Sequence, residues 1–531
     1  MRVLDAADPR LTPARTIGRK AAMGWAVGGA LAMAVSFPPW DLWFLAPAGP
    51  AGLLLAVRGR RAREAFWLGA LFGVVFFAAL LTWLINLGLA PWLLLTAIQA
   101  LATGLLGAAF AVAWKRPGRM LTLPGIWVAV EALRSRYPFG GFPWGRLGFS
   151  QADSPLASWV SLGGIPLLSW IIAAVGVCGV LAARASRRRR ALTAVSAVTV
   201  ALGGAFVLPA AATAATGGNA TSSITVAVVQ GNVPRQRAPL GQSQALEVTR
   251  NHAQATRALA AQVDAGALPA PDLVIWPESS ADRDPGRDPA TRAEILAAVT
   301  AIDRPVLIGT VLDAPDGRAR NVGQLWTPTG GPGATYDKRH LVPFGEYIPF
   351  RSVLGGRGDL ALIPRDFRPG DGPPTITSGE IRIGDVICYE IAYDDTARAA
   401  VRAGANLLVM QSNNATYMRD DQLGETRQQL AMAQLRAIEY DRAVAVATTT
   451  GISAIVRPDG TIQAQTGTWR TQTLVEDVEL RTTRTVASRL GAWPEALAVV
   501  LPFAVPGWLG VAGAGAGRRR LIKHSGRPIG P

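Results

Sequence analysis

The chain has 531 residues, of which 50% are hydrophobic and only 17% are charged, and its formal net charge is +16. Together with a mean hydropathy of +0.24, this composition argues against a fully soluble protein and predicts membrane segments. Residues 221–490 carry 28 basic and 30 acidic side chains, so the positive surplus lies in the more apolar remainder. That distribution argues against a nucleic-acid-binding protein. Two cysteines are also too few for a disulfide scaffold or a cysteine-based zinc cluster.

Eight apolar stretches lie outside residues 221–490, and a transmembrane helix needs about 20 mostly apolar residues. Seven belong to a membrane domain predicted over residues 21–212, after a basic arm at 1–20; the eighth, at 496–512, precedes a basic tail at 513–531. A cleaved signal peptide does not fit, because apolar stretches recur after the first. The expected spans are Ala21–Phe37, Leu42–Val57, Ala65–Leu87, Pro91–Trp114, Leu121–Leu133, Leu156–Ala182, Ala191–Ala211 and Ala496–Ala512.

Basic side chains indicate how these spans are oriented. Of the 25 Lys and Arg outside residues 221–490, 22 lie in the two terminal segments and in the connections around residues 58–63, 115–119 and 184–190. With eight spans all 22 fall on one side, and cytoplasmic loops are enriched in Lys and Arg. We therefore expect both termini in the cytoplasm and residues 221–490 on the extracytoplasmic side. The basic runs are then expected to contact membrane lipids.

Residues 221–490 combine short β-rich runs with amphipathic helical stretches, which predicts a layered α/β domain. A stretch rich in Ala, Gly and Thr, at 210–223, is typical of a linker in front of it. The expected strands are Ile224–Gln230, Leu273–Trp276, Pro305–Thr310, Ile381–Cys388, Leu407–Met410 and Ala443–Thr448. The expected helices are Ala245–Val263, Pro289–Ala301, Asp395–Ala403 and Glu425–Arg442.

Three reactive side chains follow predicted strands of this block. Glu278 comes directly after Pro277, which ends its strand; Lys338 is the only lysine of the block; and Cys388 ends a strand. Taken singly, Glu278 is more typical of a solvated loop carboxylate and Cys388 of an inert buried thiol, whereas Lys338 is equally typical of a surface ion pair. Together they meet the needs of a cysteine nucleophile, which requires a base and a positive charge to stabilise an oxyanion.

Histidine, the usual partner of a catalytic cysteine, is scarce in this chain. The three histidines are His252, His340 and His524, and only His340 lies near one of the three segments. A papain-like Cys–His pair would therefore have to recruit His340. The other cysteine, Cys178, lies in an expected span and cannot pair with Cys388 in an aqueous domain.

The order of these segments resembles a known superfamily. Trp276-Pro277-Glu278, then Lys338, then Cys388-Tyr389-Glu390 is similar to the carbon–nitrogen hydrolase (nitrilase) superfamily, whose members carry a Glu-Lys-Cys triad on an αββα sandwich. The string from Lys338 to Pro349 and Gly-Gly-Phe-Pro-Trp at 140–144 narrow the resemblance to the apolipoprotein N-acyltransferase family of the bacterial cytoplasmic membrane. The expected fold is a polytopic α-helical membrane bundle of about eight spans with an extracytoplasmic, nitrilase-like αββα domain over 221–490.

This resemblance also implies a reaction. An acyl chain passes from a membrane phospholipid to a cysteine thioester, and then to the α-amino group of the N-terminal S-diacylglyceryl-cysteine of an apolipoprotein, the last step of lipoprotein maturation. The implied partners are the phospholipid donor, diacylglyceryl-modified apolipoproteins and membrane lipids; no nucleic acid, cofactor or metal is expected. The implied site residues are Cys388 as nucleophile, Glu278 as base, Lys338 as oxyanion stabiliser, and Glu346, Tyr389 and Glu390 in supporting roles.

Two segments depart from the pattern of that family. No tryptophan follows Gln230-Gly231-Asn232 until Trp276, and residues 412–417 read Ser-Asn-Asn-Ala-Thr-Tyr where Ser-Asn-Asp-Ala-Trp-Phe is usual. Both changes fall where substrate loops are expected, so they bear on donor preference and on gating of the site.

Three other functions fit parts of the sequence. A membrane-anchored amidase or other nitrilase-type hydrolase would use the same triad with water as the acceptor, although it would need only one anchoring span. A catalytically inactive scaffold is less consistent with an intact triad. A transporter is disfavoured because few ionisable residues fall within the expected spans, the main exception being Glu131 beside Arg134 and Arg136.

Overall fold

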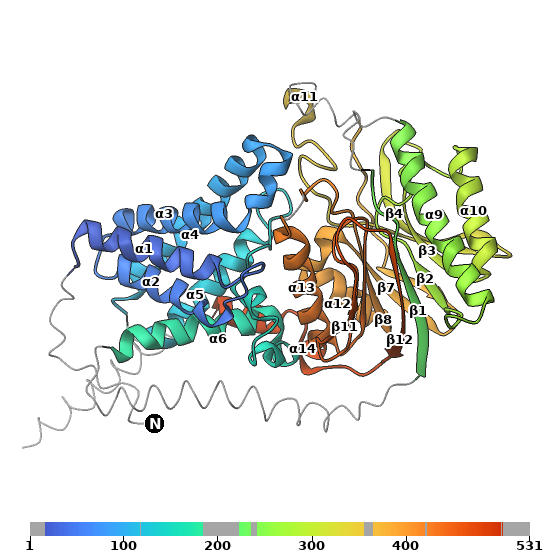
Figure 1. Ribbon diagram of the computed structural model, residues 1–531. Helices are drawn as coiled ribbons and strands as arrows, with labels where there is room; N and C mark the ends of the chain where they lie inside the picture. The colour runs from blue at the N-terminus through green and yellow to red at the C-terminus, as the bar shows by residue number, and fades with distance from the viewer. Residues whose placement is uncertain are drawn as a thin grey trace, which may run out of the picture.

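The computed structural model describes residues 16–116, 118–183, 222–234, 242–354, 365–419, 422–500 and 502. These residues form a helical part and a sheet part that lie against each other (Figure 1). The expected seventh span, Ala191–Ala211, lies outside the described residues, as do the basic tail and most of the basic arm, the linker and the eighth span, Ala496–Ala512. Residues 493–500, at the start of that eighth stretch, are helical.

The helical part contains three segments that are long and apolar enough to cross a membrane: Ala62–Leu80, Leu89–Ala113 and Ala157–Ala182. The helices at the first, second and fifth expected spans have 16, 10 and 16 residues, which is shorter than the roughly 20 that span a bilayer. Eight spans therefore stay a prediction. The helices are α1 (Arg19–Ala34), α2 (Ala48–Val57), α3 (Ala62–Leu80), α4 (Leu89–Ala113), α5 (Arg119–Arg134) and α6 (Val160–Ala182).

Small residues let α3 and α4 pack closely. A Cβ at Gly69 would lie 2.3 Å from the carbonyl oxygen of Thr103, and one at Gly107 would lie 2.4 Å from that of Ala65. Only glycine fits such an approach of two backbones, which is the usual way in which apolar helices associate where no water drives them together.

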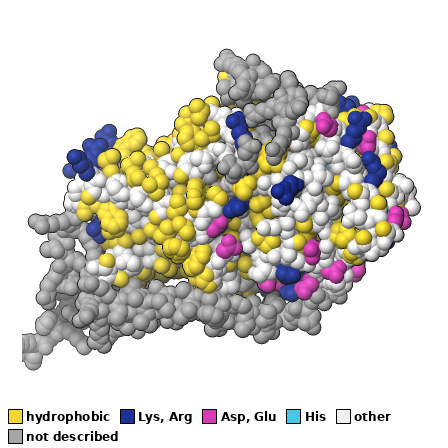
Figure 2. Space-filling model, in the orientation of Figure 1, with side chains coloured by type: hydrophobic (Ala, Val, Ile, Leu, Met, Phe, Trp, Pro, Cys, Tyr) yellow, Lys and Arg dark blue, Asp and Glu magenta, His cyan; other side chains and the backbone are white. Residues whose placement is uncertain are grey.

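One end of the helical part is rich in basic side chains (Figure 2). At the end away from the sheets, Arg60 donates a hydrogen bond of 2.6 Å to the carbonyl oxygen of Ile17, which places the connection after α2 beside the start of α1. Lys and Arg side chains gather at this end, and hydrophobic side chains cover much of the visible helical surface (Figure 2). The opposite end faces the sheet part.

The sheet part has the four layers expected from the sequence. One six-stranded sheet has the order β12-β1-β2-β3-β4-β5, and the other has the order β11-β10-β9-β8-β7-β6. Helices α9 (Gln242–Asp264) and α10 (Pro289–Ile302) cover the first sheet, whereas α12 (Asp394–Arg402) and α13 (Gly424–Tyr440) lie between the second sheet and the helical part (Figure 1). Two further short helices are α11 (Arg351–Leu354) and α14 (Val486–Leu490).

All six expected strands are present, with bounds that shift by up to three residues. They are β1 (Ser222–Gln230), β2 (Leu273–Ile275), β3 (Val306–Asp313), β7 (Ile381–Ile387), β8 (Leu407–Ser412) and β9 (Val444–Thr448). Six more strands were not expected: β4 (Ala319–Thr327), β5 (Gly331–Asp337), β6 (Thr375–Ser378), β10 (Ala454–Val456), β11 (Ile462–Gln465) and β12 (Gln472–Leu480). Most of these six carry polar or small residues and pair antiparallel with a neighbour, so tertiary pairing rather than local propensity decides their conformation.

Strand β1 shows why the expected strands were easy to predict. Val226 and Val228 belong to the core between the two sheets, whereas Ala227 and Val229 belong to the core beneath α9 and α10. Both faces of the strand are thus buried, which explains its nearly continuous apolar sequence.

Gln428 of α13 joins the two parts of the molecule. Its side-chain oxygen accepts hydrogen bonds from the indole nitrogens of Trp144 (2.6 Å) and Trp83 (3.3 Å). Its Nε2 donates to the carbonyl oxygens of Pro38 (3.0 Å) and Leu80 (3.2 Å). One buried amide therefore satisfies four polar groups of the helical part.

Replacing Gln428 with methionine is expected to destabilise the protein by about 3 kcal/mol, because buried donors and acceptors left without partners cost roughly 1–3 kcal/mol each. The thermal unfolding midpoint of the purified protein in detergent measures this change. Gln463→Met is the control, since that amide lies on β11 and bonds only to Glu476 and Asp477 of β12. Equal midpoints for the two variants would contradict the role given to Gln428.

Candidate active site

The three predicted catalytic side chains meet at one edge of the sandwich. Strands β1, β2 and β3 run parallel, and β5 runs in the same direction as β3 because each is antiparallel to β4. In the second sheet, β7, β8 and β9 are parallel as well. Glu278 follows β2, Lys338 follows β5 and Cys388 follows β7, so all three lie at the carboxyl ends of strands, where α/β folds bind ligands.

Lys338 lies between two carboxylates. Its Nζ donates hydrogen bonds of 2.9 Å to Oε1 of Glu278 and of 2.9 Å to Oε1 of Glu346. Asn321 of β4 donates from Nδ2 to the same two oxygens, at 2.7 and 2.8 Å. The lysine is only 1% exposed. Burial by itself would lower the pKa of Lys338, but the two carboxylates outweigh it and hold that pKa well above its usual value, so the side chain is a fixed cation.

The other oxygens of the two carboxylates are bound by backbone N–H groups. Oε2 of Glu278 accepts from Asn413 at 3.0 Å, and Oε2 of Glu346 accepts from Val342 at 2.7 Å. The backbone of Glu278 also lies directly against β3, where a Cβ at Gly309 would be 2.5 Å from its Cα. Glycine at 309 is therefore required for this placement of Glu278.

Cys388 occupies a strained position at the turn that follows β7. Its φ is +54°, a conformation that costs non-glycine residues free energy and is common at functional sites. The residue is 6% exposed. Burial raises the pKa of the thiol, as does the carboxylate of Glu278, whereas the charge of Lys338 acts in the opposite direction. At neutral pH the thiol is therefore protonated, and the carboxylate of Glu278 lies close enough to raise its pKa further.

Glu390 connects the ends of two strands. Its Oε1 accepts hydrogen bonds from the backbone N–H groups of Arg339 (2.8 Å) and His340 (3.1 Å), directly after Lys338. Its Oε2 accepts from the N–H of Ile387 (2.9 Å), directly before Cys388, and the hydroxyl of Tyr336 donates to both oxygens. Burial raises the pKa of Glu390, although these hydrogen bonds act against that rise.

Glu390→Gln is expected to destabilise the protein by about 2 kcal/mol and to slow the reaction of Cys388. An amide nitrogen would face an N–H donor at one of these positions, leaving a buried donor without a partner. The thermal unfolding midpoint and the rate of Cys388 alkylation measure the two effects. Glu380→Gln, at an exposed site, is the control; if both variants behave alike, Glu390 does not hold the strand ends.

The side chain of Tyr389 contacts the helical part. Its hydroxyl donates a hydrogen bond of 2.9 Å to the carbonyl oxygen of Gly141. Its ring stacks on Phe142 and Trp144, at centroid distances of 5.9 and 6.5 Å. The Gly-Gly-Phe-Pro-Trp segment, which narrows the family resemblance, therefore packs against the residue that follows Cys388.

His340 takes no part in a Cys–His pair. Its Nε2 bonds to the carboxylate of Asp395 (3.0 and 3.1 Å), and its ring stacks on Tyr393 at a centroid distance of 3.8 Å. Among the described residues, no group of three or more His, Cys, Asp or Glu side chains has the arrangement of a metal site.

Several residues of the site were not predicted from the sequence. Asn321 and the backbone of Asn413 bind Glu278, and Gln429 of α13 directs its Nε2 toward Sγ of Cys388 at 3.6 Å. The sequence offered one signal, because Asn413 lies in the 412–417 segment, directly before a residue that departs from the family pattern. The sequence pattern of an amphipathic helix does not single out Gln429, because it does not distinguish a glutamine that is buried in the fold from one that is exposed.

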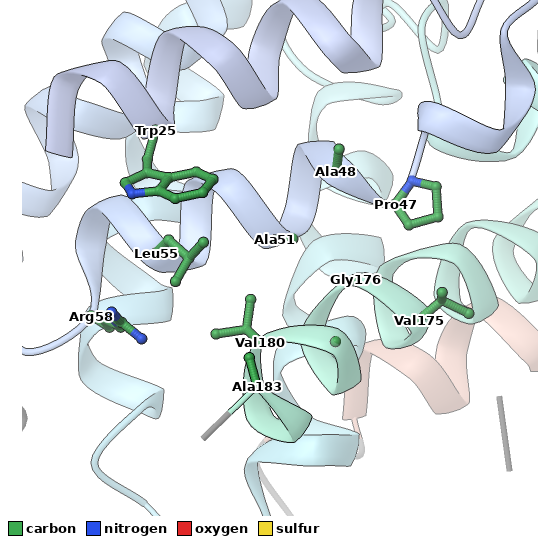
Figure 3. A pocket seen from close by; sticks show the side chains of 11 residues that line it. Trp25, Pro47, Ala48, Ala51, Leu55, Arg58, Val175, Gly176, Val180 and Ala183 are labelled. Carbon is green, nitrogen blue, oxygen red and sulfur yellow. The ribbon is translucent and has the colours of Figure 1, made fainter. Parts of the chain in front are cut away.

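A cavity of about 530 Å³ lies in the helical part, away from these residues. Side chains of α1, α2 and α6 surround it (Figure 3), and all of its lining residues are apolar or small except Arg58. None of the six predicted site residues lines it.

Comparisons with known proteins cover most of the chain. Residues 29–178 match the family model described as apolipoprotein N-acyltransferase N-terminal domain, and residues 225–488 match the carbon-nitrogen hydrolase model. The chain is 38% identical to the apolipoprotein N-acyltransferase of Mycolicibacterium smegmatis, over 92% of this chain and 85% of that protein. It is 28% identical to the enzyme of that name from Vibrio vulnificus, over 89% of this chain and 94% of that protein. Among solved structures, Saccharomyces cerevisiae Nit3, of the nitrilase superfamily, is 16% identical, with a TM-score of 0.37, over 52% of this chain and 96% of that one.

Proposed function

Because this chain belongs to the apolipoprotein N-acyltransferase family and is an acyltransferase, we propose that it moves an acyl chain from a membrane phospholipid to the N-terminus of an apolipoprotein through a thioester on Cys388. The observation that carries this proposal is the buried Glu278–Lys338–Glu346 cluster, together with Cys388, whose backbone is strained and whose buried thiol interacts electrostatically with Glu278 and Lys338. The contacts of Tyr389 and Gln428 with the helical part support a site that receives lipid from the membrane.

In the first step the carboxylate of Glu278 takes the proton of the Cys388 thiol. The thiolate attacks the ester carbonyl of the phospholipid, and the charge of Lys338 stabilises the oxyanion that forms. When the intermediate collapses, the leaving alkoxide takes the proton from Glu278 and departs as a lysophospholipid. The acyl chain stays on Sγ as a thioester.

In the second step the α-amino group of an S-diacylglyceryl-cysteine attacks that thioester. Glu278 accepts a proton from the amine, the amide forms, and the thiolate leaves and is reprotonated by Glu278. Glu346 has a separate role: while Glu278 carries the proton, Glu346 still pairs with Lys338 and holds the cation in place.

We also propose that the sheet part lies on the extracytoplasmic side of the membrane, with both termini in the cytoplasm. The basic connection between α2 and α3 lies beside the start of α1, at the end of the helical part away from the sheets, and basic loops stay in the cytoplasm. Labelling single cysteines introduced at Arg61 and at Arg457 with a membrane-impermeant thiol reagent, in intact cells, tests this: only the second is expected to react.

The reaction is tested with a phospholipid that carries a labelled acyl chain. The purified protein is expected to acquire a label that hydroxylamine removes and that a synthetic diacylglyceryl-cysteine peptide accepts as an amide. If water releases the label as a free fatty acid and the peptide never receives it, the chain acts as a hydrolase and the proposed transfer is wrong.

A further inference from the structure

A chain of buried hydrogen bonds leads from α13 to the thiol. Nδ2 of Asn414 donates to Oε2 of Glu425 (2.6 Å) and to Oε1 of Gln429 (3.1 Å). Nε2 of Gln429 in turn lies 3.6 Å from Sγ of Cys388, within the range of a hydrogen bond to sulfur. Glu425, Gln429 and Asn414 are each no more than 2% exposed, so water does not compete for these bonds.

The amide of Gln429 has one orientation available in this network. Its Oε1 accepts from Nδ2 of Asn414 and also from the hydroxyl of Ser412, at 2.9 Å. Because two donors hold the oxygen end, the nitrogen end faces Cys388. The carboxyl of Glu425 orients Asn414, because Oε2 of Glu425 accepts a hydrogen bond from Nδ2 of Asn414.

A buried thiolate needs more than one favourable contact. Lys338 divides its hydrogen bonds between two carboxylates, and burial disfavours a negative charge on the sulfur. An N–H donor aimed at Sγ stabilises the anion in a buried site, where hydrogen bonds to charged groups are strongest.

We propose that Gln429 is a catalytic residue that donates a hydrogen bond to the Cys388 thiolate, and that Asn414 and Glu425 are positioning residues that hold the Gln429 amide in the required orientation. The proposal deepens the proposed function, on which it rests for the identity of the acyl donor. It concerns formation of the thiolate, and therefore also the reactivity of the thiol without any lipid.

Glu425 acts in this network as a neutral acceptor. Burial raises the pKa of Glu425 to about 8, against the opposing effect of the bond from Asn414, so the carboxyl is protonated near neutral pH. A glutamine at 425 can accept the same hydrogen bond from Asn414 without a charge. Methionine at 425 fills a similar volume but accepts nothing.

The test uses Cys178→Ala as the parent protein, so that Cys388 is the only thiol. Two rates are measured at pH 7: alkylation by iodoacetamide, and single-turnover thioester formation from a labelled phospholipid in mixed micelles. Gln429→Met is expected to slow both by about 10- to 100-fold, the worth of a hydrogen bond to a charged group. Gln434→Met is the matched control, since this buried amide on the same helix bonds to Asp153 and Gly460 instead, and it is expected to stay within twofold of the parent.

Two substitutions at position 425 distinguish a role in positioning Gln429 from a general effect on folding. Glu425→Gln is expected to keep both rates within threefold of the parent, whereas Glu425→Met is expected to lower them about fivefold or more. If Gln429→Met reacts as fast as Gln434→Met, the catalytic role is overturned; if the two variants at 425 are equally slow, the positioning role is overturned. If the parent forms no thioester from phospholipid, the proposed function fails, and the alkylation rates still decide this proposal.

Discussion

Cys388→Ala is expected to lower acyl transfer by about 10⁴-fold or more and to remove every hydroxylamine-sensitive label from the protein. Without the thiol no thioester forms, and loss of a covalent nucleophile typically costs that much even when binding is intact. The residue is small and 6% exposed, so the loss of one sulfur atom leaves the fold in place. Labelled protein, separated from lipid and counted after hydroxylamine treatment, gives the result directly.

The second cysteine of the chain provides the control. Cys178 lies on α6 in the helical part, outside the cluster around Lys338, so Cys178→Ala is expected to form the thioester at the parental rate. A thioester that persists in Cys388→Ala and disappears in Cys178→Ala would show that Cys178 is the nucleophile. That result would refute the proposed mechanism.

Lys338→Met is expected to lower the rate of thioester formation by about 10³-fold, since a single oxyanion-stabilising group contributes 10²- to 10³-fold and the base loses its partner as well. The same change is expected to lower the free energy of unfolding by about 3–5 kcal/mol, because it leaves the carboxylates of Glu278 and Glu346 buried without a counter-charge. Single-turnover kinetics and unfolding in detergent measure the two effects.

The control for this variant is Arg320→Met. Arg320 pairs with Asp337, the residue before Lys338, at 2.7 Å, but the two side chains are 28% and 23% exposed. Such a partly exposed pair contributes at most about 1 kcal/mol. If Lys338→Met unfolds at the same temperature as Arg320→Met and still forms the thioester at the parental rate, the lysine is neither the counter-charge nor the stabiliser that we describe.

The catalytic candidates were predictable because each has a local signature. Glu278 follows a proline that ends an apolar strand, Lys338 is the only lysine in residues 221–490, and Cys388 ends another apolar strand. Their order along the chain is what resembles a known superfamily. A motif of this kind predicts which residues react, since the reacting groups themselves must be present in the sequence.

The residues that support them were not predictable in the same way. Asn321 lies on β4, a strand that the sequence did not reveal, and reaches Glu278 across 43 positions of the chain. Gln428 bonds to Trp144, 284 positions away. Such contacts depend on how layers pack, and a hydrophobic pattern carries no information about the partner of a buried polar group.

By itself, the sequence determined the division into an apolar, basic part and a nearly neutral α/β part, because composition and charge are properties of the chain before it folds. It also determined which groups are available for chemistry. Only the tertiary structure decided that Lys338 joins Glu278 to Glu346, and that Gln429 faces Cys388. The physical reason is that local periodicity reports burial, whereas hydrogen bonds between distant segments exist only after the strand ends and α13 have been brought together.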